Sequence, residues 1–182
     1  DHLAAPAGGG HPLDLQAGVW QQEARRCLDW LETSALAPDR GLRMDGASES
    51  DEADAALLSV AWQGPWRVGH PVVTATVDRV MERLASGPLL YRYSDRVADG
   101  RSGPDNPDIE SSLLAVKARA RQGRWEDAHE TMEAVVGLGG EGPVLFPETA
   151  DPVSGEPLGN FPSTAVALAL MDAAEALGTG PR

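Results

Sequence analysis

The chain has 182 residues, a formal net charge of −13 and one cysteine, Cys27. This length is sufficient for a domain with a hydrophobic core, and a single cysteine excludes an internal disulfide. The acidity argues against binding to nucleic acid or anionic membranes, because phosphate recognition needs clustered lysine and arginine, and no stretch approaches the roughly 20 apolar residues of a membrane span.

The first segment, residues 1–13, is rich in Gly, Ala and Pro, and we expect it to be a flexible lead-in. It has neither the basic region nor the apolar run of a signal peptide, which favours a cytoplasmic protein. The sequence does not begin with Met, so we expect that the chain was cut from a longer protein.

Helical spacing predicts a first helix from Asp14 to about Leu36. Its apolar stripe consists of Trp20, Ala24, Cys27, Leu28 and Leu31. We therefore interpret Cys27 as a core residue rather than a nucleophile. The indoles of Trp20, Trp30 and Trp125 are also predicted to serve packing.

Two further helices follow a polar loop. The second is predicted to start at Asp51 or Asp54 and to stop at Gly64-Pro65. The third starts at Pro71, a residue favoured in the first helical turn, and ends by residues 87–88. Residues 89–93, LLYRY, are expected to be a short extended segment.

The last three helices are marked by caps and breakers. Asp108 is the predicted cap of the fourth helix, which Gly123 ends. Trp125 opens the fifth helix, and a sixth follows Pro162 to about Leu177.

These patterns predict an all-α fold, a single helical domain over residues 14–178 with a tail at 179–182. Six helices with alternating short and long connections suggest three αα-hairpins side by side. The long loops at 94–107 and 143–162 are then expected at the same end.

The loop between the fifth and sixth helices, LFPETADPVSGEPLGNFP at 145–162, contains Glu148 beside a proline. A long loop between packed helices is more often functional than idle. Residues 151–162 resemble a loop of glycoside hydrolase family 15, the glucoamylase and trehalase type, which reads D-P-x-T-G-E-x-L-G-N-F-P after an acid. The segments ARRCLDWLETSALAPDRGLRMDG, EADAALLSVAW, HPVVTATVDRVMERLASGPLLYRY and QGRWEDA also resemble that family, in order, over about 150 residues.

The resemblance implies half of a toroid of six αα-hairpins and inverting hydrolysis of an α-glucosidic bond, without metal or cofactor. An inverting enzyme needs a general acid and a general base roughly 6.5–9.5 Å apart. The family's base position matches Glu148, for which a solvated loop acid is the alternative. The family's acid lies in a W-E-x-R-G segment, and this chain contains none.

Several site positions depart from the family pattern. The polar Q-A-F-S-H segment after GNFP is replaced by residues 163–167, STAVA, and the acid and aromatic after Glu148 by Thr149 and Ala150. The alternative is therefore a catalytically inactive helical module derived from this fold, serving protein interaction or ligand sensing.

Four further residues are candidates for contact with a sugar: Trp66, Tyr91, Asp105 and Asn160. The alternative role of the two aromatics is packing in the core. Asp105 and Asp108 are also carboxylates, and their alternative roles are a turn residue and a helix cap, respectively. Asn160 and Phe161 are expected to fix the loop against the last helix. None of the four histidines has metal-ligand spacing, so no metal site is predicted.

A half-toroid would leave apolar surface uncovered at two edges. The partner expected there is the missing amino-terminal half, on the parent chain or on another protein, with a second copy as the alternative. The edges are predicted around Trp20 and Trp30 and around Ala165, Leu168 and Met171.

Overall fold

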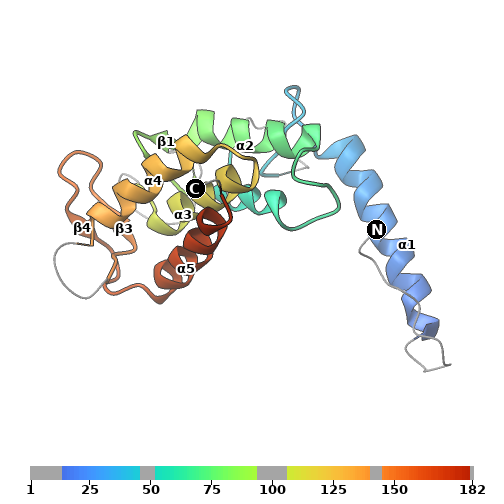
Figure 1. Cartoon of the computed structure of the whole chain (residues 1–182). Coiled ribbons are helices and arrows are strands. Elements are labelled where there is room, and N and C mark those ends of the chain that lie inside the picture. Colours follow the sequence, from blue (N-terminus) through green and yellow to red (C-terminus); the bar gives the residue numbers. More distant parts are fainter. Residues whose placement is uncertain (1–13, 46–51, 94–105, 140–144, 181–182) are drawn as a thin grey trace.

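The computed structural model describes residues 14–45, 52–93, 106–139 and 145–180. The helices are α1 (Asp14–Ser34), the 3₁₀ helix η1 (Ala55–Ala61), α2 (Pro71–Leu84), α3 (Ile109–Arg121), α4 (Trp125–Gly137) and α5 (Thr164–Gly178). The strands are two residues each: β1 (Ala85–Ser86), β2 (Leu89–Leu90), β3 (Thr149–Ala150) and β4 (Pro157–Leu158). The all-α prediction is confirmed (Figure 1).

Local capping chemistry explains where the later helices begin. The Asp108 carboxylate accepts a hydrogen bond from the Ser111 amide at 2.7 Å, and Pro71 occupies the first turn of α2. Gly123, at φ 77°, follows the end of α3. These starts and stops agree with the sequence predictions.

The second predicted helix differs from its prediction in type and length. Asp54 does cap it, accepting from the Ala56 amide at 2.8 Å. The element is nevertheless a 3₁₀ helix that ends at Ala61 rather than at Gly64. It is fixed mainly by burial, since Ala55 and Leu58 are fully buried.

Helix α3 is the centre of the fold. It packs against η1 on one side and against α4 and α5 on the other. Ala115 and Ala118 join a first core cluster with η1 and α2, whereas Leu113 and Val116 join a second cluster with α4 and α5. A helix buried on nearly every side holds the two clusters together.

Helix α1 leads away from the other helices (Figure 1). Cys27 is exposed, so the prediction that it is a core residue is wrong. Trp20 is 66% exposed and Trp30 is 49% exposed, so neither side chain is packed among the described residues, and both lie in the region for which an uncovered apolar edge was predicted. Only Leu28 and Leu31 of the predicted stripe are partly buried. The amphipathic pattern is present, but within the described part of the chain no second helix covers it (Figure 1).

The four short strands bring the loop ends together. β1 pairs with β2 and β3 with β4, both antiparallel, and Asp108 bridges Leu90 on one side and Thr149 on the other. Residues 106–108 and 148–150 therefore lie at the same end, as predicted for the two long loops. Residues 94–105 and 140–144 lie outside the described part of the chain.

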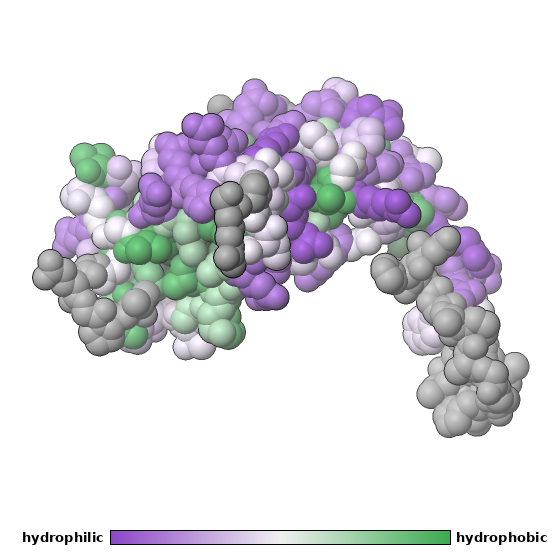
Figure 2. Space-filling model, in the orientation of Figure 1, coloured by the Kyte–Doolittle hydropathy of each residue, from purple (hydrophilic) through white to green (hydrophobic). Residues whose placement is uncertain are grey.

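The hydropathy of the surface differs between parts of the molecule. Hydrophobic residues gather over α5, whereas much of the upper face of the view is hydrophilic (Figure 2). Leu168 and Met171 of α5 are 62% and 69% exposed. No helix among the described residues combines the length and hydrophobicity needed to cross a bilayer.

Candidate functional site

The backbone of Glu148 is held on both sides just before β3. Its amide donates to the Asn160 carbonyl at 3.0 Å, and its carbonyl accepts from the Ile109 amide at 3.0 Å. The first bond ties Glu148 to the segment after β4, and the second ties it to the first residue of α3. The start of the central helix thus fixes the position of this carboxylate.

The side chain of Glu148 is half-buried and is oriented by Asn160. Its Oε2 accepts from Asn160 Nδ2 at 2.9 Å and from the Asn160 amide at 3.2 Å. Among the described residues, Oε1 has no hydrogen-bond partner. One carboxylate oxygen is therefore fixed while the other is able to accept a proton.

Gly159 explains why the GNFP segment has a glycine at this point. Its φ is +75°, and a Cβ there would lie 3.1 Å from both Cβ and Oε2 of Glu148. Only a glycine allows the backbone to adopt this conformation so close to the carboxylate. Glu148, Gly159 and Asn160 thus form one local unit.

The D-P-V-S-G turn has a structural role. Asp151 Oδ1 accepts from the amides of Val153 at 2.9 Å and Ser154 at 2.7 Å, and from Ser154 Oγ at 3.0 Å. The hydrogen bonds from the Ser154 and Val153 amides hold the pKa of the Asp151 carboxyl below its usual value. Asp151 therefore closes the turn as a carboxylate.

Phe161 and Ser163 connect the loop to the last helix in different ways. The Ser163 amide donates to the Phe146 carbonyl at 2.9 Å, and its hydroxyl caps α5. Phe161, expected to fix the loop against α5, is 61% exposed and cannot do so by burial. Phe146, which is 2% exposed, is the aromatic that anchors the loop in the second core cluster.

Arg92 is a cation at this end that the sequence analysis did not select. Its Nε donates to the Tyr93 hydroxyl at 3.0 Å. This hydrogen bond, together with the charges of Asp54 and Asp108, raises the pKa of Arg92 above its usual value. The Y-R-Y pattern was the available signal, since an arginine between aromatics beside a carboxylate-rich end is suited to hydroxyl recognition.

The two aromatic candidates have other partners. Trp66 stacks on His70 with ring centroids 5.8 Å apart, and its Nε1 donates to Glu32 Oε1 at 3.4 Å. The Tyr91 hydroxyl accepts from Ser86 Oγ at 3.3 Å. Both pack against the first core cluster, so contact with a sugar stays a prediction for them, while Asp105 lies outside the described residues.

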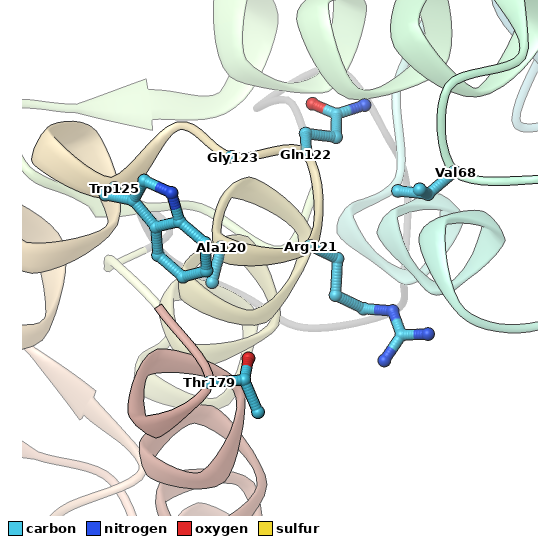
Figure 3. Close-up of a pocket in the computed structure, with 7 residues that line it drawn as sticks. All are labelled: Val68, Ala120, Arg121, Gln122, Gly123, Trp125 and Thr179. Carbon is cyan, nitrogen blue, oxygen red and sulfur yellow. The ribbon is translucent and has the colours of Figure 1, made fainter. Parts of the chain in front are cut away.

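A hollow of about 520 Å³ lies at the other end of α3 (Figure 3). Its lining comes from the end of α3, the start of α4, the end of α5 and the segment before α2: Val68, Ala120, Arg121, Gln122, Gly123, Trp125 and Thr179. No residue predicted for the site lines it. Among the described residues there is also no group of three or more His, Cys, Asp or Glu side chains that could hold a metal ion.

Known protein families and curated proteins give no match to this sequence. Solved structures do match its fold. A wild-type glycosidase superposes with a TM-score of 0.73 at 17% identity, covering 91% of this chain and 46% of its own. A glycosidase variant in which a phenylalanine is replaced by tyrosine superposes with a TM-score of 0.75. A variant in which a glutamate is replaced by alanine, in complex with glucose, superposes with a TM-score of 0.73. Identity and coverage are the same for both variants as for the wild-type glycosidase.

The chain therefore has a glycoside-hydrolase-like fold. It spans less than half the length of the solved glycosidases that it matches. At 17% identity the likeness concerns the fold.

Proposed function

We propose that this chain provides the base-bearing half of an α-glucoside hydrolase of the glucoamylase and trehalase type, acting with inversion. The observation that carries the proposal is the Glu148 carboxylate, with Oε2 held by Asn160 and Oε1 without a partner among the described residues. This geometry suits a general base, because Oε1 can take a proton from a water molecule that attacks the anomeric carbon.

Two other residues support this role. Asn160 fixes the rotamer of Glu148, because its backbone amide and its side-chain amide both donate a hydrogen bond to Oε2 of Glu148. Arg92 stays charged at the same end and offers guanidinium donors to a sugar hydroxyl. Neither residue transfers a proton, so both are positioning groups.

The family pattern assigns no residue of this chain as the general acid. Glu126 follows Trp125, but both belong to α4, where Glu126 lies in the first turn. The Trp-Glu pair is therefore part of a helix and does not form an acid-bearing loop. Hydrolysis of an ordinary glucoside is proposed to require a second part that supplies the acid.

Binding of 1-deoxynojirimycin, a cationic glucose mimic, tests the role of Glu148. Titration calorimetry or NMR shifts of the chain should report binding that Glu148→Gln abolishes, because the carboxylate attracts the cation. Glu156→Gln is the matched control, since Glu156 lies exposed in the same loop. Equal binding by all three proteins, or no binding at millimolar mimic, would contradict the proposal.

A second candidate function is a catalytically inactive helical module for protein interaction. The exposed Leu168 and Met171 on α5 favour it. This function predicts association of the chain without any response to the sugar mimic. Binding of the sugar mimic therefore discriminates between the two candidates, because only the hydrolase predicts it.

A further inference from the structure

Helix α5 is apolar on nearly every side, although the described residues cover only one side of it. Of its 15 residues only Asp172 and Glu175 are charged. It packs on α3 through Val166 and Ala173, both buried. A helix that is apolar all round is typical of the interior of a larger fold. We therefore expect further polypeptide to cover its outward side.

The outward side of α5 has the shape of a helix-packing surface. We call it the α5 face, and it consists of Ala167, Leu168, Met171 and Ala174, all exposed. Hydrophobic residues gather over this helix (Figure 2). The four residues recur at spacings of three and four, so they form one ridge along the helix. The two alanines leave grooves beside the larger side chains, into which the side chains of a second helix can pack.

The charge beside this ridge indicates what the second helix must carry. Glu175 lies one helical turn after Met171 and has no ion-pair partner among the residues that the structure describes, whereas Asp172 pairs with Lys117 at 2.8 Å. Covering Glu175 without a cation would bury an unpaired carboxylate, which is costly. The neighbouring helix α4 also has exposed acids and no lysine or arginine. A basic partner therefore fits the α5 face, and a second copy, which would bring another Glu175, does not.

The fold comparison indicates that the occupant is polypeptide. Only 46% of the solved glycosidase chain is matched, so more than half of that chain lies outside the part that resembles this one. We propose that the α5 face docks a helix of another polypeptide segment, with an apolar stripe and with lysine or arginine beside it. Such a helix would belong to the second part that the proposed function requires, but its docking does not depend on the chemistry of Glu148.

Two synthetic helices of about 18 residues, or five turns, test the charge that the α5 face selects. Both carry the same leucine stripe, and the positions beside it hold lysine in one helix and glutamate in the other. In an NMR titration of the whole chain, the lysine helix should shift amide signals of α5. The glutamate helix should bind at least about tenfold more weakly, because it places like charges together. Equal binding of the two helices, or no binding of the lysine helix at millimolar concentration, would overturn the proposal.

Variants of the α5 face test whether the apolar ridge is the contact. The double variant Leu168→Ser and Met171→Ser should bind the lysine helix at least about tenfold more weakly, because the central apolar contacts are lost. Both side chains are exposed, at 62% and 69%, so its circular dichroism should match the wild type. Val153→Ser is the control, since Val153 is 95% exposed outside the α5 face, and it should bind like the wild type. Unchanged binding by the double variant would reduce the contact to general attraction between charges and overturn the proposal.

Light scattering tests the competing occupant, a second copy. The chain alone should have its monomer mass of 19.2 kDa. A dimer that Leu168→Ser and Met171→Ser dissociated would show that a second copy covers the α5 face, and it would overturn the proposal. None of these experiments uses a sugar, so failure here is separate from failure of the proposed function.

Discussion

The position of the Glu148 side chain depends on the glycine beside its partner. Gly159→Ala would place a methyl group 3.1 Å from Cβ and Oε2 of Glu148 and 3.3 Å from Thr149 Oγ1. We expect a loss of about 1–2 kcal/mol from the left-handed backbone, plus about 1 kcal/mol or more from the steric clash. Urea unfolding measures the total, and binding of the sugar mimic should weaken with it.

Gly87→Ala is the matched control for that substitution. Gly87 also has a positive φ, +59°, but a Cβ there meets nothing within 4 Å. It should incur the backbone cost without the clash and leave sugar binding unchanged. Equal destabilisation by the two variants would show that the contact with Glu148 is not tight.

Asp151 gives a prediction about acid. Its hydrogen bonds lower the pKa of the folded carboxyl, so its stabilising contribution is present above the unfolded pKa and is lost as pH falls through the folded pKa. Asp151→Asn keeps an oxygen acceptor but removes this titration. We therefore expect its melting temperature to fall less than that of the wild type between neutral and acidic solution, while Glu156→Gln should follow the wild type.

Individual site residues were predictable where the chain carried a distinctive local pattern. Glu148 and Asn160 were both selected from one loop, and the structure brings them within hydrogen-bond distance. Arg92 was missed because its neighbours, Asp54 and Asp108, are distant in sequence and meet it only through the strand ladder.

At the scale of elements, the cap of α3 links helix stability to the site. Asp108 caps α3, and its amide donates to the Leu90 carbonyl at 2.7 Å. Asp108→Ala should cost about 0.5–2 kcal/mol in urea unfolding, because an amide of the first turn loses its acceptor. Asp108→Asn retains an acceptor and should be close to wild type. If Asp108→Ala and Asp108→Asn lowered the free energy of unfolding equally, the negative charge rather than the hydrogen-bonded cap would be the stabilising feature.

The bounds of helices that depend on local caps and helix breakers were predictable from the sequence. Features that depend on packing between distant segments were not. Asp108, Gly123 and Pro71 act on neighbouring residues, so the bounds of α2 to α4 follow from local sequence. The exposure of α1 did not follow from its amphipathic stripe, because that stripe predicts a buried face without saying which chain covers it. Only the resemblance to half of a toroid placed Trp20 and Trp30 at an uncovered edge.

For the whole molecule, the proposed lack of a general acid gives a prediction about catalysis. We expect no measurable turnover of maltose, trehalose or isomaltose by the isolated chain, because general acid assistance to a poor leaving group is worth about 10²–10⁴-fold. Glucose release can be followed by coupled assay. Turnover of any of these sugars that Glu148→Gln abolished would show that the chain contains an acid after all.

The most direct measurement uses α-glucosyl fluoride, whose leaving group needs no proton. If Glu148 is the base of an inverting site, the wild-type chain should hydrolyse this compound faster than buffer does, and NMR should detect β-glucose as the first product. Glu148→Gln should reduce the rate to that of buffer, while Glu156→Gln should not. Hydrolysis at the buffer rate by the wild-type chain, or α-glucose as the first product, would contradict the account.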